Sequence, residues 1–271
     1  MRNKFGLLGH PLGHSFSKKF HDERFSRMGI DAEYVNFDLE DISMFPAILL
    51  DEPSLCGLNV TIPYKEKVIP FLDEMDSVAQ RIGAVNTICI RKISTDESRE
   101  RESKIQGFWL KGYNTDIIGF RDSIKPMLQL AGILDSEGRS QNDASALILG
   151  TGGASKAIRV ALEDMGIAFS FVSRSKLPGQ LNYEQLSPAL MASHCLIINC
   201  TPLGTFPNVN ECPNIPYECL TPHHVCYDLV YNPEVTLFLT KAKEKGAFTM
   251  SGGAMLEGQA IASYKYWTEE S

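Results

Sequence analysis

A glycine-rich turn is the feature of this sequence with the clearest chemical meaning. The run Gly150-Thr151-Gly152-Gly153-Ala154-Ser155 follows the apolar segment 146–149 and precedes a stretch with helical periodicity. Between a strand and a helix, such glycines allow a tight turn and let the backbone and the helix N-terminus approach a pyrophosphate. Ser155 stands where the usual pattern has a third glycine, so a turn that binds no ligand remains the alternative.

The next predicted strand ends at Ser173-Arg174-Ser175, and this segment bears on the choice of cofactor. An NAD site usually carries an acidic residue here, which binds the ribose 2′-hydroxyl. The sequence has Arg174 and Lys176 instead, and a guanidinium suits a 2′-phosphate and can stack on adenine. The segment favours NADP over NAD, unless Arg174 is simply a solvated loop residue.

Polar residues of a second kind occur in the first half of the chain and just after it. They are Ser15 and Ser17, Asn59, Thr61 and Lys65, Asn86 and Thr87, and Asn114, Thr115 and Asp116. Each has an ordinary structural alternative, such as a helix cap for Ser15 or Asp116, a solvated lysine, or a buried amide for Asn86. Together, these hydroxyls, amides, one ammonium and one carboxylate suit a polyhydroxylated ring held beside a proton-transfer pair.

The apolar pattern predicts the elements that must position these residues. Strands are predicted at 4–9, 33–37, 55–61, 84–90, 146–150, 169–173, 195–199, 225–230 and 247–250, and helices at 15–29, 41–50 (with an irregularity at Pro46), 64–73, 116–130, 154–166, 183–193 and 234–245. After residue 115, apolar strands alternate with helices, which predicts a parallel sheet covered on both faces. Residues 94–104 carry seven charges of mixed sign and no apolar face, which indicates a solvated hairpin tip.

Composition excludes several classes of protein. Of the 271 residues, 44% are hydrophobic and 22% charged, as in folded globular proteins. The net charge is −7, whereas a protein that binds nucleic acid usually has an excess of basic residues. No apolar run approaches the about 18 residues of a membrane helix, and the N-terminus has no signal-peptide core, so we expect a soluble, cytoplasmic protein that binds neither nucleic acid nor membrane.

The seven cysteines point to a reducing compartment. Their number is odd and no CxxC pair occurs, so free thiols fit best. Cys219, His223, His224 and Cys226 lie close together in the sequence, but their spacing matches no zinc site. We therefore expect buried or incidental thiols here and no metal.

Several motifs, in order along nearly the whole chain, resemble shikimate dehydrogenases. They are Gly13–Ser17, Asn59–Lys65, Gly83–Thr87, Asn114–Asp116, the glycine turn, Asn199–Gly204, Asp228–Pro233, and the terminal Gly252, Met255, Leu256 and Gln259. There are departures: Ile117 and Ala254 stand where many members have glycine. Ser173-Arg174-Ser175 replaces a frequent Asn-Arg-Thr but keeps the arginine.

The resemblance implies an α/β fold of two domains with the substrate in a cleft between them. The substrate-binding domain would comprise residues 1–115 and 251–271, and a Rossmann-like, doubly wound NADP-binding domain would comprise 116–250. The implied reaction is the reversible NADPH-dependent reduction of 3-dehydroshikimate to shikimate in aromatic amino-acid biosynthesis. The oligomeric state stays open between a monomer and a homodimer, because family members differ.

The same resemblance implies roles for individual residues. Lys65 and Asp116 would flank the reacting oxygen as the catalytic pair. The substrate would be bound by Ser15, Ser17, Asn59, Thr61, Asn86, Tyr231 and Gln259. The cofactor would be bound by Gly150, Gly152, Gly153, Ala154, Ser155, Ser173, Arg174, Ser175, Thr201, Leu229 and Gly252.

Two other functions remain open at this point. One is a quinate/shikimate dehydrogenase that uses NAD, which the lack of a carboxylate near Ser173 disfavours. The other is a non-catalytic protein that binds NADP or a shikimate-like ligand and regulates something else. A binding protein has no need of a lysine–carboxylate pair, so Lys65 and Asp116 argue against it.

Overall fold

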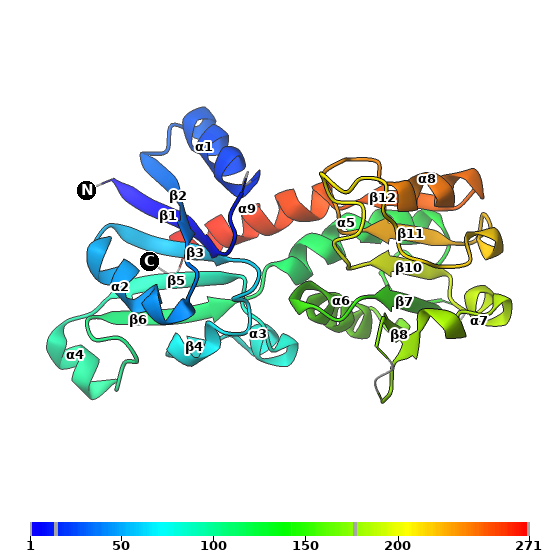
Figure 1. The fold of residues 1–271 in the computed structure, drawn as a ribbon. Helices are drawn as coiled ribbons and strands as arrows, with labels where there is room; N and C mark the ends of the chain where they lie inside the picture. The colour runs from blue at the N-terminus through cyan, green and yellow to red at the C-terminus, as the bar shows by residue number, and fades with distance from the viewer. Residues whose placement is uncertain (1, 14–15, 142, 176–177, 270–271) are drawn as a thin grey trace. The chain divides into compact units, whose positions relative to one another are not determined.

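The computed structural model describes residues 2–13, 16–141, 143–175 and 178–269 (Figure 1). The chain divides into two compact units, one comprising Met1–Thr115 with Ala260–Ser271 and the other Asp116–Gln259. The α/β class predicted from the sequence is confirmed, since each unit contains its own six-stranded sheet with helices.

The second boundary between the units differs from the expected position after residue 250. It falls after Gln259, inside the last helix α9 (Gly253–Glu269). A close approach within the second unit explains the difference: a Cβ on Gly119 would lie 2.3 Å from the Met255 carbonyl oxygen and 2.9 Å from the Gln259 nitrogen. The first turns of α9 therefore pack on the helix that holds Gly119.

The first unit is built on a mixed sheet with the strand order β2-β1-β3-β5-β6-β4. β1 is parallel to β2 and β3, β5 is antiparallel to β3 and β6, and β4 is parallel to β6. The strands are β1 (Asn3–Gly9), β2 (Ala32–Asp38), β3 (Leu55–Val60), β4 (Glu74–Met75), β5 (Thr87–Lys92) and β6 (Phe108–Tyr113).

Helices connect these strands, and local sequence explains their ends. They are α1 (Phe16–Met28), α2 (Phe45–Asp51), α3 (Ser77–Ile82), α4 (Thr95–Glu100) and the 3₁₀ helices η1 (Ile42–Met44) and η2 (Ile69–Phe71). α3 begins after Asp76, whose carboxylate accepts hydrogen bonds from two backbone N–H groups, and ends at Gly83 with φ of 71°. The predicted helix 41–50 is divided between η1 and α2, because Pro46 is tolerated only in the first turn of α2.

The second unit is a parallel sheet with the strand order β12-β11-β10-β7-β8-β9. In chain order within this unit the arrangement is 6-5-4-1-2-3, that of a doubly wound dinucleotide-binding fold. The strands are β7 (Ser145–Leu149), β8 (Ala168–Ser173), β9 (Leu181–Asn182), β10 (Leu196–Asn199), β11 (Val225–Asp228) and β12 (Phe248–Ser251). The predicted doubly wound sheet is confirmed.

Both faces of this sheet are covered by helices. The helices are α5 (Asp116–Leu130), α6 (Gly153–Asp164), α7 (Pro188–Ala192), α8 (Leu237–Glu244) and the 3₁₀ helices η3 (Tyr183–Gln185) and η4 (Tyr217–Cys219). On one face, Leu147 and Ile197 share an apolar core with Met191 of α7 and Phe238 of α8. On the other, Tyr227 of β11 meets Phe120 and Ser123 of α5. Burial on two faces explains the continuous apolar runs.

The helix predicted at 64–73 is wrong. This segment consists of turns followed by η2, although Val68 N–H donates to the Tyr64 carbonyl over one helical turn. Pro70 has no N–H to continue an α-helical ladder, and Pro63 precedes the segment closely. The stretch between the two prolines is too short for a stable helix.

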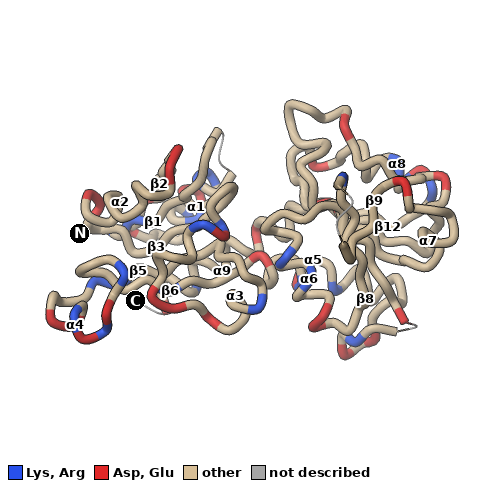
Figure 2. The backbone as a smooth tube through the Cα atoms, turned by 60° about the horizontal axis from the view of Figure 1, so that its bottom comes forward, with Lys and Arg blue, Asp and Glu red and all other residues tan. Residues whose placement is uncertain are grey.

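The charged segment 94–104 contains a helix that the sequence analysis did not predict. Strands β5 and β6 form an antiparallel pair, and α4 lies in the connection between them. The Ser94 side chain accepts a hydrogen bond from Glu97 N–H at the start of α4. Arg91 and Arg101 both pair with Glu97 at 3.0 and 3.2 Å, and Figure 2 shows both signs of charge interspersed there.

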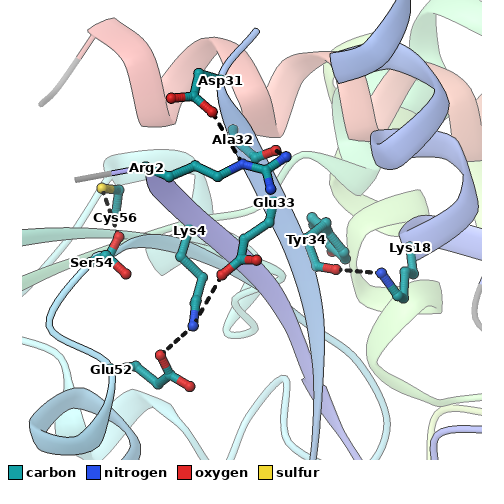
Figure 3. Close-up of polar contacts among 10 residues, drawn as sticks. All are labelled: Arg2, Lys4, Lys18, Asp31, Ala32, Glu33, Tyr34, Glu52, Ser54 and Cys56. Atoms are coloured by element: carbon teal, nitrogen blue, oxygen red, sulfur yellow. Dashed lines mark hydrogen bonds and ion pairs between the residues drawn. The ribbon is translucent and has the colours of Figure 1, made fainter.

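Ion pairs lie at the edge of the first unit's sheet (Figure 3). Lys4 on β1 pairs with Glu52 and, at 3.1 Å, with Glu33 on the edge strand β2. The hydrogen bond to Glu52 contributes most to raising the pKa of Lys4 above its usual value. Lys18 of α1 donates to the Tyr34 carbonyl at 2.8 Å. Charges at this edge disfavour pairing with a strand of another chain.

In the described part of the chain, no helix combines the length and apolar character that crossing a bilayer requires.

Candidate active site

A buried network of amides and hydroxyls surrounds Asn86 in the first unit. The Asn86 Oδ1 atom accepts from the Thr115 backbone N–H at 2.7 Å and from Thr87 Oγ1 at 3.0 Å, and its Nδ2 atom donates to Thr115 Oγ1 at 3.0 Å. Ser263 Oγ of α9 lies 2.7 Å from Thr87 Oγ1 and 3.0 Å from Thr115 Oγ1. The network fixes Thr115, the residue directly before Asp116.

Lys65 is positioned beside this network by backbone hydrogen bonds. Tyr64 N–H donates to the Thr61 carbonyl at 2.8 Å, which closes a turn after β3, and Val85 N–H donates to the Lys65 carbonyl at 2.7 Å. The backbone of Lys65 is thereby paired with the residue that precedes Asn86. The Lys65 side chain is half-buried. These backbone hydrogen bonds bring Lys65, Thr61 and Asn86 into one region of the first unit.

The Asn59 side chain, which is expected to bind substrate, makes hydrogen bonds to other side chains of the protein. Its Oδ1 atom accepts from the Tyr34 hydroxyl at 2.8 Å, and its Nδ2 atom donates to Ser263 Oγ at 2.8 Å. Burial raises the pKa of Tyr34 well above its usual value, and a hydrogen bond with Ser17 opposes this rise. Ser17, in the first turn of α1, thus joins the same polar group through Tyr34.

The remaining predicted catalytic and substrate residues lie in the second unit or outside the described residues. Asp116 is buried as the first residue of α5, where the helix N-terminus favours a carboxylate. Gln259 is also buried, against Gly119 of α5. Tyr231 is 41% exposed, and partial burial raises its pKa. Ser15 lies outside the described residues.

The glycine turn lies at the point of the parallel sheet where the strand order reverses. Gly150 follows β7 with φ of 102°, a conformation that glycine adopts readily. A Cβ on Gly150 would lie 3.1 Å from Thr201 Cγ2, in the segment that follows β10. Gly152 has open space around its Cβ position and provides no side-chain cap for α6. The turn thus offers room and backbone N–H groups to an anion.

Ser155, in the place of the third glycine, is accommodated by a local hydrogen bond. It is 1% exposed, and its Oγ atom donates to the Gly152 carbonyl at 2.6 Å. Gly153 and Ala154 precede it in the first turn of α6. The serine therefore leaves the space at Gly152 open.

The segment after β8 presents the expected cation. Ser173 is buried and donates to the Ser175 carbonyl, whereas Arg174 is exposed. The charge of Arg174 acts on Tyr183 of η3: burial raises the pKa of Tyr183, and Arg174 partly opposes the rise. Among the described residues the guanidinium makes no ion pair, and it lies just after the carboxyl end of β8, where a nucleotide 2′-phosphate is expected.

Leu229 and Gly252 contact each other after the neighbouring strands β11 and β12. A Cβ on Gly252 would lie 2.2 Å from the Leu229 carbonyl oxygen, so glycine is required for this approach. The two residues thus lie together, and Thr201 lies at the same end of the sheet.

Comparison with known proteins identifies the family. A sequence profile of the shikimate dehydrogenase substrate binding domain matches residues 7–88. The NADP(+) shikimate dehydrogenase of Desulforamulus reducens is 33% identical to this protein over 97% of this chain and 89% of its own length. The chain belongs to the shikimate dehydrogenase family. The NADP(+) shikimate dehydrogenase of Moorella thermoacetica is 37% identical, over 97% of this chain and 86% of its own.

Solved structures of this family also share the fold. The shikimate 5-dehydrogenase of Thermus thermophilus, solved in complex with NADP(H) and shikimate, matches with a TM-score of 0.77 at 29% identity. The match covers 98% of this chain and 94% of that one. The family resemblance predicted from the motifs is therefore confirmed.

Sequence analysis did not identify Tyr34 and Ser263, two residues of this shikimate dehydrogenase family protein that hydrogen-bond to the predicted site residue Asn59. Tyr34 alternates with polar residues in a strand, and Ser263 stands in the apolar run of a helix. Ser263 could have been identified from its position among apolar residues of a helix, because a buried hydroxyl needs a hydrogen-bond partner.

The Cys219–Cys226 cluster is explained by local contacts. His224 is buried, its Nδ1 atom lies 3.0 Å from the Thr221 nitrogen, and its Nε2 atom lies 3.1 Å from the Met191 carbonyl. Within the described ranges, no three or more His, Cys, Asp or Glu side chains are grouped to hold a metal ion.

Proposed function

We propose that this protein catalyses the reversible NADPH-dependent reduction of 3-dehydroshikimate to shikimate. The observation that carries the proposal is the similarity to NADP(+) shikimate dehydrogenases along 97% of the chain. It is supported by a glycine turn at the switch point of a doubly wound sheet and by a polar network beside Lys65.

The residues of the second unit fit an NADP molecule. The open space at Gly152 and the N-terminus of α6 would accept the pyrophosphate. Arg174 would bind the 2′-phosphate as a bidentate cation, while Ser173 and Ser175 shape its loop. Thr201, Leu229 and Gly252 would lie toward the nicotinamide. When bound, the cofactor supplies the hydride.

The polar groups of the first unit suit a hydroxylated carboxylic acid. Ser15 and Ser17 would bind the carboxylate, with help from Tyr231. Thr61, Asn86 and Gln259 would hold ring hydroxyls, whereas the amide of Asn59 is engaged by Tyr34 and Ser263 and would act by supporting the site. Hydroxyl and amide groups held by a fixed network reduce the entropy lost on binding.

Lys65 and Asp116 would perform the proton transfer. A carbonyl carbon that accepts hydride leaves negative charge on its oxygen, and an ammonium group placed there stabilises that charge and can donate a proton. A carboxylate beside the lysine keeps it charged and oriented.

The proposal extends to the roles of the units and to the compartment. The unit that contains Met1–Thr115 would bind the substrate, and the unit Asp116–Gln259 would bind the cofactor. A cytoplasmic location is supported by the seven cysteines, since none of them is joined in a disulfide in the structure.

Nicotinamide absorbance tests the proposed function directly. Purified protein is incubated with shikimate and either NADP⁺ or NAD⁺, and a parallel pair contains quinate. Fast reduction with shikimate and NADP⁺ alone is expected. Turnover of quinate or strong use of NAD⁺ would move the assignment to broader-specificity dehydrogenases, and tight ligand binding without turnover in all four mixtures would indicate a binding protein.

A further inference from the structure

Asp228, at the end of β11, is a buried carboxylate surrounded by hydrogen-bond donors. It is 0% exposed, and its Oδ1 atom accepts from Asn199 Nδ2 at 2.9 Å and from Val230 N–H at 3.0 Å. Its Oδ2 atom accepts from Thr236 Oγ1 at 2.6 Å. Only the ionised carboxylate can accept on both oxygens without itself donating, so these donors select the charged form.

The carboxylate sets the direction of a chain of hydrogen bonds. Because Asn199 Nδ2 donates to Asp228, the Asn199 Oδ1 atom is oriented the other way, where it accepts from Thr201 N–H at 3.0 Å and from Thr201 Oγ1 at 2.6 Å. Thr201 Oγ1 in turn accepts from Leu203 N–H at 3.3 Å. The hydroxyl of Thr201 is therefore used inside the loop.

This loop, residues 200–204, forms one wall of the switch point. Its Thr201 methyl group is the atom nearest to a Cβ built on Gly150, at 3.1 Å. At its other end, Gly204 adopts a φ of 90° and packs against Thr236, the residue that donates to Asp228. One buried carboxylate thus holds both ends of the loop that lies against the glycine turn.

We propose that Asp228 is a positioning residue for the dinucleotide: through Asn199 and Thr236 it holds residues 200–204 in the conformation that forms the cofactor site beside Gly150. The inference rests on the proposed function, since it concerns the cofactor of that reaction. Asp228 acts through its neighbours and has no role as a proton donor to substrate.

The surroundings of Asp228 make its contribution dependent on pH. Burial raises the pKa of Asp228 to about 6, although the bonds from Thr236, Val230 and Asn199 lower it in part. The charge of Asp228 adds to the effect of burial in raising the pKa of the neighbouring Cys200, Cys226, Tyr217 and Tyr227, so these groups are neutral at physiological pH. Protonation of Asp228 below about pH 6 therefore removes the charge that orients Asn199.

The first test replaces Asp228 by asparagine, which keeps the shape but supplies one acceptor oxygen to three donors. Calorimetric titration with NADP⁺ is expected to show a dissociation constant raised by about ten-fold or more, the factor that corresponds to one hydrogen bond to a charged group. The turnover number at saturating NADP⁺ should change much less. Asp122→Asn, at an exposed carboxylate of α5, is the matched control.

The second test uses Asn199→Asp, because it gives a pH response opposite to that of the wild type. Two carboxylates facing each other at this distance share one proton. At pH 8 the variant should bind NADP⁺ about ten-fold more weakly than the wild type, whereas at pH 6 the shared proton replaces the lost amide donor and the ratio should approach one. Comparing the two proteins at each pH removes the effect of the 2′-phosphate, which titrates in the same range.

The outcomes separate this inference from the proposed function. Binding of NADP⁺ by Asp228→Asn that equals the wild type, or an Asn199→Asp to wild-type ratio that is constant with pH, contradicts the positioning role alone. A wild-type protein that binds NADP⁺ but oxidises no shikimate contradicts the proposed reaction alone. A wild type that binds no NADP⁺ contradicts both.

Discussion

Lys65 and Arg174 are the two cations on which the proposed chemistry depends most. They differ in surroundings: Lys65 is half-buried after a backbone turn, whereas Arg174 is exposed after β8. A compact ammonium suits proton donation, and a planar guanidinium suits a phosphate. Substitutions at the two positions should therefore affect different kinetic constants.

Lys65→Ala should abolish most turnover while leaving substrate binding largely intact. Loss of a group that acts in proton transfer lowers kcat by about 10²- to 10⁴-fold, and the backbone bond from Val85 to the Lys65 carbonyl is retained by alanine. Steady-state kinetics with shikimate measures both constants. Lys67→Ala, at an exposed neighbouring lysine, should behave as the wild type. Weakened affinity with unchanged kcat would refute the catalytic role.

Arg174→Ala should raise the KM for NADPH more than the KM for NADH. Loss of a charge-assisted bond to the 2′-phosphate corresponds to about ten-fold or more, and NADH has no 2′-phosphate with which to make that bond. The ratio of the two KM changes is the measurement, with Arg174→Lys as the variant that keeps the charge but not the bidentate geometry. Equal changes for both cofactors would remove the phosphate assignment.

Helix α1 packs through a histidine that has no polar partner among the described residues. His21 is 0% exposed, its ring stacks on Tyr34 at 4.5 Å between ring centroids, and Phe25 and Trp267 also surround it. Neither ring nitrogen of His21 has a hydrogen-bond partner among the described residues. Burial lowers the pKa of His21 to about 3, and the charge of Arg24 adds to this effect. Acid therefore disfavours the packing of His21, and with it the packing of helix α1 against the first unit.

His21 should make the folded protein sensitive to acid. Above pH 6.5 the imidazole is neutral in both states, but below it the unfolded chain takes up a proton that the folded chain does not, so stability falls as the pH drops from 6.5 toward 3. At pH 5 the loss is about 2 kcal/mol. Urea unfolding at pH 7.5 and pH 5 measures it.

His21→Phe should remove this part of the pH dependence, because phenylalanine fills an apolar site without a titrating group. His223→Gln, at an exposed position, serves as the control and should retain the wild-type difference between the two pH values. The interpretation is wrong if acid destabilises His21→Phe as much as it destabilises the wild type.

At the scale of the whole molecule, the end of the chain completes the first unit. Trp267 of α9 is 1% exposed, stacks on Phe5 of β1 at 4.8 Å and donates from Nε1 to the Ile88 carbonyl at 3.0 Å. A Cβ on Gly57 would lie 2.3 Å from the indole, so glycine makes room for it. The first unit is therefore discontinuous in sequence but has one aromatic core.

Trp267→Ala should destabilise the first unit and spare the cofactor site. Truncation of a buried tryptophan costs about 3–5 kcal/mol, and Ile261→Ala, at a 39% exposed position of the same helix, should cost far less. Hydrogen exchange should quicken in β1, β3 and β5 but not in β7 to β12, and NADP⁺ affinity should persist. A loss of stability below about 1 kcal/mol would contradict this account.

Local chemistry along the chain was enough to predict much of the second unit. The helix predicted at 116–130 matches α5 in full, because a strong apolar period coincides with a carboxylate at its N-terminus. The helix prediction for residues 64–73 was wrong because the two prolines prevent the helix that the apolar pattern favoured. Strand β6, which was not predicted, has only weak alternation, and its pairing with β5 supplies what its own sequence does not indicate.

The sequence by itself was enough to predict the glycine turn, the cation after β8 and the family motifs. Each of these features depends only on residue types and spacing within a few positions. Distant pairings do not follow from such spacing. That β10 lies beside β7, so that Thr201 meets Gly150, is a property of the sheet order. That Ser263 joins Thr87 and Thr115 across more than a hundred residues depends on where α9 packs. The physical reason is that burial and pairing select partners by position in space, and position in space is set by the assembled core.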